Sequence, residues 1–474
     1  MPTGKIPFGS LVSKNTNDDF VTDRNSLLVN GYLKEEGVTA KWPGLNLITS
    51  LSAASGSAIN GLYWWPMQGK MVTVGSGIVA LVSYSGGVYS SINLTNAVPN
   101  TGRLTFAYDA AKVYIADGGK IMYSDGTANS LIDIADADAP TSCTHVAYLD
   151  GYIIANNSNS RFYFSAIEDG STWSALDFAS ASGNPDTIQA LVVYDRKIFL
   201  VGNETTEIWY NDGETPFSRG DGGFIENGTI APNSVIKTRK GVIWLDTERN
   251  LVISTGGQPE TLSLSYQKEI DSIATVSDCE SLFIEWEGSA FIVLNFPTSN
   301  RTLMYNMVTK DWSELGEWNS ASSSYNIWRG KTYAYAPSWG KRIVGDRYLN
   351  YFHEISPTDL SNTSGAARFV KRTGFINYGS DSLKRCNRVT LKVKRGYGAI
   401  TSLTVPKLLL RWRNDGSSQW SNEKEISLGL SGDPLHVIDV YPRGAYRTRQ
   451  YELSCSENVP LAFMDAEEDY TVLR

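Results

Sequence analysis

The sequence predicts an all-β protein made of a β-propeller, with seven blades favoured and six possible, and a C-terminal antiparallel β-sandwich-like domain. The first observation is composition: Gly (42), Tyr (25) and Trp (13) are abundant beside many Ser, Thr and Asn residues. That mixture favours strands and tight turns over helices. The second observation is an internal repeat, and the third is a run of alternating strands near the C-terminus.

The N-terminal segment, residues 1–55, is rich in Asn, Asp and Ser and ends in AKWPGLNLITS. It carries no copy of the repeat. We therefore expect an extended arm or a small platform segment here.

Residues 56–358 hold the repeat, in which an aromatic or apolar strand, a short polar turn and a second strand recur. Copies read LYWWPMQGKMVTVG, VAYLDGYIIANN and FIEWEGSAFIVLN. A period of roughly forty to fifty residues is typical of four-stranded propeller blades, which stack around an axis because one blade cannot bury both faces alone. The second strands begin near Met71, Val113, Ile153, Ile198, Val242, Phe291 and Thr332.

A linker, SPTDLSNTSGAAR, is expected to join the propeller to residues 366–474. This last region alternates apolar and polar residues in RVTLKVKRG, PKLLLRWRN and RQYELSCS. Such alternation indicates strands with one buried face, and we expect a compact antiparallel sandwich.

The bulk composition indicates a folded chain, with 42% hydrophobic and 19% charged residues. No apolar window is long enough for a membrane-spanning helix, and the start, MPTGKIPFGS, lacks the pattern of a signal peptide. We expect no membrane insertion and no export by the secretory route. The cysteines are scattered and read as buried thiols in a reducing cytosol: Cys143, Cys279, Cys386 and Cys455.

Two segments resemble degenerate copies of the Asp-box, the S-x-D-x-G-x-T-W turn of sialidases and other propellers. They are AIEDGSTW at 166–173 and RNDGSSQW at 413–420. Because the Asp-box carboxylate braces a hairpin while the tryptophan packs beneath it, the motif reports architecture and not catalysis. We expect structural roles in these turns for Glu168, Gly170, Trp173, Asp415 and Trp420.

A search for chemistry returns no catalytic motif. The three histidines, His145, His353 and His436, show no metal-ligand spacing, and DADAP at 136–140 lacks the calcium-loop pattern. There is no phosphate-binding loop, nucleophile elbow or H-E-x-x-H helix motif. We therefore predict no catalytic residue, no cofactor and no metal.

The net charge of −8 argues against a dedicated nucleic-acid binder, but it hides a basic stretch. Residues 368–413 contain twelve Lys or Arg and one acid, Asp381. The stretch is either a solvated sheet face or a docking face for an acidic partner or a phosphate backbone. Under the second reading the candidate interface residues are Lys384, Arg385, Arg388, Lys392, Lys394, Arg395, Arg411, Trp412 and Arg413.

Three regions resemble the packaged-DNA stabilisation proteins, also called tail hub or nozzle proteins, of short-tailed bacteriophages (podoviruses). The first is LLVNGYLKEEGVTAKWPGL, where Asn30 and the Pro43-Gly44-Leu45 run match the opening signature of the family. The second runs from RFYFSAIEDGSTW to NETTEIWYNDG, over 161–213, and the third is PKLLLRWRNDGSSQWSNEKEISLG. The resemblance spans most of the chain and weakens between about 50 and 140 and after 430.

The resemblance implies a virion structural protein of the tail, assembled in the host cytoplasm, with no enzyme activity. Members form a ring with copies of themselves, typically a hexamer, below the head-to-tail adaptor ring. They extend the DNA channel, retain packaged DNA until ejection and carry fibre, spike or needle proteins, while viral DNA passes without sequence-specific binding. In that picture the basic stretch faces the adaptor or neighbouring subunits and not the channel.

Two other functions remain open at this stage. A glycan-binding or glycan-degrading tail propeller could stack sugars on aromatics such as Trp64, Trp65 and Trp209, although core packing explains them more simply. A cytosolic scaffold of the WD-repeat type is disfavoured, because no W-D or G-H pair recurs at the blade period.

Overall fold

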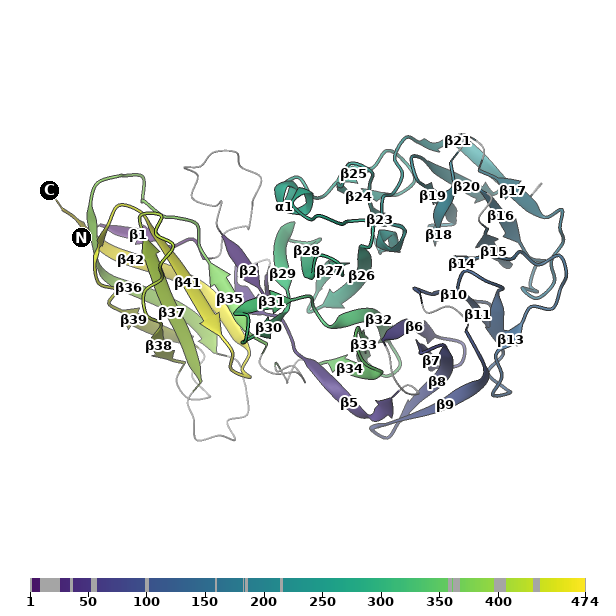
Figure 1. Cartoon of the computed structure of the whole chain (residues 1–474), viewed down its shortest axis with the longest axis horizontal. Coiled ribbons are helices and arrows are strands. Elements are labelled where there is room, and N and C mark those ends of the chain that lie inside the picture. The colour runs from purple at the N-terminus through teal and green to yellow at the C-terminus, as the bar shows by residue number, and fades with distance from the viewer. Residues whose placement is uncertain are drawn as a thin grey trace.

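The computed structural model describes residues 2–8, 26–34, 37–52, 58–98, 102–157, 160–181, 183, 186–213, 216–356, 360, 367–395, 406–428 and 435–473. The expected linker lies largely outside these residues. Within them the fold is all-β apart from α1 (Gln267–Asp271) and the short 3-10 helix η1 (Pro232–Ser234). Figure 1 shows a ring of small sheets joined to an elongated sandwich that holds both chain ends.

The ring is a β-propeller in which six blades are separate four-stranded antiparallel sheets. The first three blades in chain order are β6–β9 (Ile59–Trp65, Lys70–Gly75, Ile78–Ser85, Val88–Ala97), β10–β13 (Thr105–Tyr108, Val113–Ala116, Met122–Ser124, Ile132–Asp133) and β14–β17 (Val146–Leu149, Tyr152–Asn156, Arg161–Phe164, Phe178–Ser180). The next two are β18–β21 (Ile188–Tyr194, Lys197–Gly202, Thr206–Asn211, Phe217–Ile225) and β22–β25 (Ile236–Lys237, Val242–Leu245, Leu251–Ser254, Glu260–Thr261). The last of the six consists of β32–β34 (Gly330–Ala336, Lys341–Asp346, Tyr351–Ile355) and is completed by the N-terminal strand β5 (Leu45–Ser52).

The remaining repeat, β26–β29 (Glu280–Trp286, Ser289–Phe296, Arg301–Asn306, Asp311–Leu315), is a four-strand meander in the same ring. It is not a separate sheet, because β2 (Leu27–Val29) pairs in parallel with β29 through Val29 and Glu314. This pairing extends the meander into a nine-stranded sheet. The favoured count of seven blades is therefore not confirmed as seven separate sheets.

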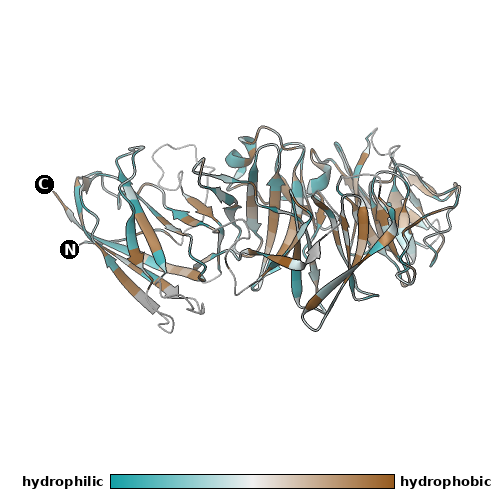
Figure 2. Cartoon of the chain, turned by 60° about the horizontal axis from the view of Figure 1, so that its bottom comes forward, coloured by the Kyte–Doolittle hydropathy of each residue, from teal (hydrophilic) through white to brown (hydrophobic). Residues whose placement is uncertain are grey.

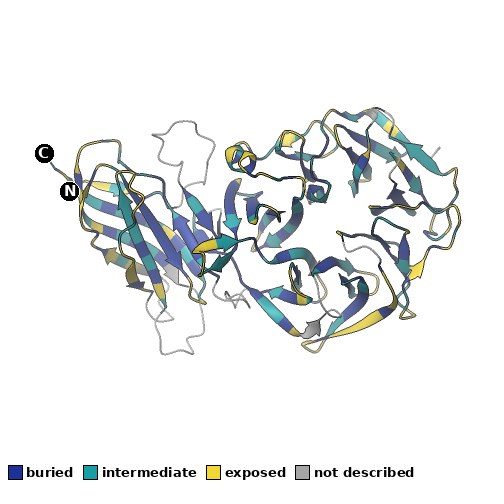
Figure 3. Cartoon of the chain, viewed as in Figure 1, coloured by how far each residue is buried: buried dark blue, intermediate teal, exposed yellow. Residues whose placement is uncertain are grey.

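Local sequence explains the blade geometry. Second strands such as β11 and β23 are buried along their whole length, since each lies between two strands of its own sheet and between neighbouring blades. Several hairpins turn through residues with positive φ, and Asp195 and Arg196 (48° and 58°) give the two left-handed positions that a tight hairpin requires. Figure 3 shows the buried middle strands and the exposed residues of the outer strand β9.

The ring is closed by two distant parts of the chain. The strand β5 pairs antiparallel with β34, through contacts such as Leu45 with Ile355 and Asn46 with Glu354. The first strands of the repeats follow one another around the axis, with β32 beside β6. The apolar clusters lie between adjacent blades, as Ile154 and Phe162 packing with Ile198 illustrates.

The C-terminal domain packs two antiparallel sheets face to face. One continues the nine-stranded sheet through β2, β35 (Phe369–Arg372), β41 (Arg449–Cys455), β37 (Lys407–Asn414) and β38 (Lys424–Ser427). The other contains β3 (Gly31–Leu33), β4 (Thr39–Lys41), β42 (Leu461–Val472), β36 (Lys384–Arg395) and β39 (Leu435–Val440), with β1 (Thr3–Lys5) on β42 and β40 (Ala445–Tyr446) on β36. A hairpin, β30 (Glu317–Asn319) with β31 (Ser324–Asn326), follows the β26–β29 meander.

The described part of the N-terminal segment 1–55 forms no sheet of its own. Its strands pair with the sandwich through β1 and β4, and with the propeller through β5. The side chain of Asn30 ties the two together, since it donates to the backbone oxygens of Gly316 and Arg368 at 2.8 and 2.9 Å. The segment therefore joins the propeller to the sandwich.

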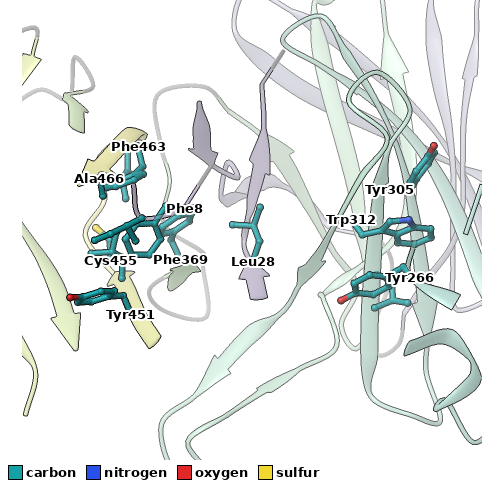
Figure 4. Close-up of a cluster of buried hydrophobic side chains, with 14 of the residues drawn as sticks. Phe8, Leu28, Tyr266, Tyr305, Trp312, Phe369, Tyr451, Cys455, Phe463 and Ala466 are labelled. Carbon is teal, nitrogen blue, oxygen red and sulfur yellow. The ribbon is translucent and has the colours of Figure 1, made fainter. Parts of the chain in front are cut away.

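One apolar cluster runs from the sandwich into the propeller. Figure 4 shows Leu28 between the sandwich residues around Phe8 and the propeller residues around Trp312. The Trp312 ring stacks on Tyr266 with 5.2 Å between centroids. Figure 2 shows hydrophobic residues following the strands of both domains. The shared core and shared sheet couple the two domains mechanically.

Candidate functional site

The Asp-box-like turn at 166–173 is braced by a carboxylate one residue beyond the expected position. Asp169 accepts hydrogen bonds from the Ser171 hydroxyl (2.5 Å) and the Thr172 hydroxyl (2.8 Å), and these bonds hold its pKa far below the ordinary value. Glu168 contributes backbone, with φ at 59° and its N–H donating to Gly151. Trp173 is buried and donates from Nε1 to the carbonyl oxygen of Gly170 at 3.0 Å.

The second turn, at 413–420, uses its aspartate differently. Asp415 Oδ1 accepts the backbone N–H groups of Arg447 and Thr448 at 2.7 and 2.8 Å, which fixes the approach to β41. Trp420 lies against three guanidinium groups, of Arg372, Arg411 and Arg413, at 4.8 to 5.3 Å from its ring. The first turn is thus held by bonds within it, and the second by bonds from Asp415 to the chain just before β41.

The basic strand β36 lies beside acidic strands. Arg388 sits between Asp469 (2.7 Å) and Asp439 (3.5 Å) on the outer face of the sheet. Lys392 lies 3.8 Å from Glu467 and 3.9 Å from Asp465. The positive charge that the sequence concentrates between 368 and 413 is therefore largely offset on this face by β39 and β42.

The other residues of the candidate interface divide into buried and surface positions. Lys384 is fully buried, and its ammonium donates to the carbonyl oxygens of Ser380, Ser382 and Arg447. Arg385 is exposed at the start of β36. The side chains of Lys394 and Arg395, at its end, lie outside the described residues.

On the opposite sheet, Glu452 is buried and binds two arginines. Its carboxylate lies 2.5 Å from Arg411 and 2.6 Å from Arg372, while Arg413 donates to Gln450 at 2.6 Å. Burial and the neighbouring guanidiniums lower the pKa of Arg413. Trp412 is half-buried, 6.0 Å from the Arg449 guanidinium.

A cavity with a volume of about 1060 Å³ lies among the first strands of the blades. Its walls come from first strands of the blades, and Tyr63, Phe106, Tyr108 and Tyr148 give it an aromatic lining. Tyr63 stacks on Phe106 at 5.3 Å between centroids. Of the tryptophans considered for sugar stacking, none lines this cavity.

One end of the axis carries a collar of polar side chains, with one from the start of each repeat. Its members are Asn60, Arg103, His145, Gln189, Asn233, Glu280 and Lys331. Arg103 reaches across the ring, and its guanidinium donates to the carbonyl oxygens of Asn233 and Ser281, the latter at 3.0 Å. Burial and the Arg103 charge lower the pKa of His145 to about 4. Lys331 donates to Asn60 Oδ1 at 2.7 Å.

The sequence search missed the collar because its members are isolated in the chain. The collar residues do share a position in the repeat, since each lies just before or at the start of a first strand. An alignment of the repeats on those strands would therefore have grouped them.

Among the residues that the structure describes, no three His, Cys, Asp or Glu side chains are placed to hold a metal ion. In the same residues, no helix has the length and apolarity to cross a membrane. All four cysteines are buried and unpaired with one another.

The family model described as "Bacteriophage P22 Gp10, beta-propeller" matches residues 12–358 of the chain. No curated protein matches. Solved structures with similarity include the computationally designed Ika8 protein (12% identity, 74% of this chain and 100% of that chain, TM-score 0.38). Another is the WD40 β-propeller domain of Doa1 (13% identity, 66% of this chain and 97% of that chain, TM-score 0.39). A third is BamB from Moraxella catarrhalis (12% identity, 65% of this chain and 97% of that chain, TM-score 0.35).

Proposed function

Because this chain belongs to the phage DNA-stabilisation family and is a bacteriophage structural protein, we propose that it forms the tail hub or nozzle ring below the head-to-tail adaptor. In this role the ring, a hexamer of this chain, extends the DNA channel, retains packaged DNA and supports the distal tail parts. The observation that carries the proposal is the family match over 12–358, about three quarters of the chain.

The coupling of the two domains supports a load-bearing role. A nine-stranded sheet runs from the propeller through β2 into the sandwich, and one apolar cluster spans the same junction. Because interiors are close-packed and transmit strain, a protein built this way resists bending between its domains. That property suits a part that holds pressurised DNA.

Charge also supports a conduit. The net charge is −8, and like charges discourage contact with phosphate. On the outer face of β36, Arg388 and Lys392 already have acidic partners. This pairing favours the interpretation of the basic stretch as a solvated face. A density map with Lys392 lining the DNA channel would contradict the assignment.

We further propose that the protein acts without catalysis, in the virion tail, after assembly in the host cytoplasm. Its partners would be copies of itself, the adaptor ring, and fibre, spike or needle proteins, with DNA passing through. The glycan-directed alternative gains no support from the described residues, because the tryptophans proposed to stack sugars do not line the cavity among the first strands of the blades.

The test is deletion of the gene from its virus, with the wild-type gene supplied in trans as the control. Particles are imaged, and head DNA is assayed for nuclease protection. The proposal predicts heads that fill and then leak, with no distal tail. Full, tailed particles that only fail to recognise the host surface would overturn it.

A further inference from the structure

Three cations gather around one carboxylate where the collar meets the last repeats. Arg347, directly after β33, lies 2.9 Å from Glu280 at the start of β26. Lys331 stands at the start of β32, and Arg103 reaches the same region by its bond to the backbone oxygen of Ser281. Three different repeats thus contribute charge to one end of the axis.

The cations of this group are incompletely paired. Nε and Nη2 of Arg347 are buried without a hydrogen-bond partner among the described residues, and the side chain is only 8% exposed. The ammonium of Lys331 has a neutral partner, the amide oxygen of Asn60. Arg103 bonds to backbone carbonyl oxygens, which carry no full charge.

Nearby carboxylates do not neutralise the excess positive charge of this group, because they bind other partners. Asp346, the chain neighbour of Arg347, is bound by Arg329 at 2.8 Å and His353 at 2.9 Å. Asp278, two residues before Glu280, accepts the backbone N–H of Thr298. The group of Arg103, Lys331, Arg347 and Glu280 therefore carries a net charge of about +2.

The mutual influence of these groups agrees with their close approach. Burial lowers the pKa of Lys331, the Glu280 carboxylate raises it, and the charges of Arg347 and Arg103 lower it further. Burial also lowers the pKa of Arg103. The Arg347 side chain is buried, while Arg103 and Lys331 are half-buried. Buried charge without a full partner is costly, and a bound anion is the simplest way to offset it.

We propose that this end of the propeller axis binds a small oxyanion of phosphate size, held by Lys331, Arg103 and the free guanidinium edge of Arg347. A guanidinium edge with two unpaired N–H groups matches the oxygens of phosphate or a carboxylate, and lysine adds a point charge. The bound anion would link the blade that contains β32–β34 to the blade that begins with β10. The proposal is independent of the tail role, because it concerns a single chain.

The experiment uses the full-length chain with inorganic phosphate, compared with sodium chloride at equal ionic strength. Isothermal titration calorimetry measures binding, and the thermal midpoint measures stabilisation by a ligand that prefers the folded state. Sulfate and acetate serve as further probes, and they separate a dianion site from a carboxylate site. We expect phosphate or sulfate to bind and to raise the midpoint, with chloride giving no matching effect.

Two variants and a control locate the site. Lys331→Gln and Arg347→Lys each remove a proposed contact, and each is expected to weaken binding about tenfold or more. Lys392→Met removes a charge on the outer face of β36 and is expected to leave binding unchanged. If a variant fails to fold, broadening of the phosphate ³¹P signal by the wild-type chain shows whether the chain binds the anion. No broadening and no heat with wild type, or equal binding by wild type and a folded Lys331→Gln, would overturn the proposal.

Discussion

Two groups of buried charge, one in each domain, are built in opposite ways. In the sandwich, Glu468 is fully buried and accepts hydrogen bonds from the phenols of Tyr378, Tyr446 and Tyr451 at 2.6 to 2.8 Å. Arg449, also fully buried, lies 3.8 Å from the same carboxylate. In the propeller, by contrast, the cations Arg103, Lys331 and Arg347 outnumber the Glu280 carboxylate, and Arg347 keeps unpaired donors.

The difference separates a structural role from a binding role. The Glu468 carboxylate is surrounded by donors, and the Arg449 guanidinium further donates to Asn414 and to the backbone oxygen of Gly444. Its Nη1 has no hydrogen-bond partner among the described residues, but it lies 3.8 Å from the Glu468 carboxylate. A buried polar network whose members are mostly satisfied stabilises one packing arrangement. The group of Arg103, Lys331, Arg347 and Glu280, in which two buried donors of Arg347 have no partner among the described residues and the cations exceed the carboxylates, has capacity left for an anion.

The largest effect is expected from breaking the sandwich network. Glu468→Gln removes the charge that Arg449 and three phenols share, so the free energy of unfolding should fall by about 3–5 kcal/mol. Urea denaturation followed by circular dichroism measures the change. Glu467→Gln, one residue earlier and on the outer face, is the matched control and should cost less than about 1 kcal/mol. Equal effects of the two substitutions would contradict the assigned role of Glu468.

The collar should make stability sensitive to pH. The pKa of His145 is about 4 in the folded chain, below its ordinary value near 6.5. As pH falls through this window the unfolded chain takes up the proton first, so stability decreases between about pH 6.5 and 4. We expect His145 to contribute a loss of about 1–3 kcal/mol across the window.

The measurement is the denaturation midpoint of wild type and His145→Gln at steps of pH. The variant should show a shallower decrease below pH 6.5 and a parallel curve between pH 7 and 8, where the histidine is neutral in both states. Parallel curves over the whole range would show that burial beside Arg103 does not suppress protonation of this histidine.

How much could be read from sequence depends on how local each feature is. The propeller and the sandwich were predictable because repeat period and alternation are local patterns. The merged sheet was not, because the parallel pairing of Val29 with Glu314 joins distant segments. The basic stretch looked unbalanced because its partners, Asp439 and Asp469, become neighbours of Arg388 only in the folded sheet.

The turn at 166–173 gives a smaller contrast between adjacent acids. Asp169→Ala removes the acceptor of the Ser171 and Thr172 hydroxyls and should destabilise the chain by about 1 kcal/mol. Glu168→Ala should change stability by less than about 0.5 kcal/mol, since only the Glu168 backbone bonds in the turn. Denaturation of both variants measures the difference. A larger loss at Glu168 would restore the aspartate position of the intact Asp-box as the brace.

The smallest effect is expected at Lys392, and it tests the two readings of the basic stretch. The Lys392 side chain is 39% exposed, and its ammonium lies 3.8 Å or more from its two acidic partners, so Lys392→Met should change the free energy of unfolding by less than about 1 kcal/mol. Added salt should reduce even that difference, because exposed pairs are screened. Virus carrying the substitution should then assemble normal tails if the face is only solvated. Stable protein combined with heads that lack tails would instead identify Lys392 as part of a docking face, since stability and partner binding would have been separated by one charge.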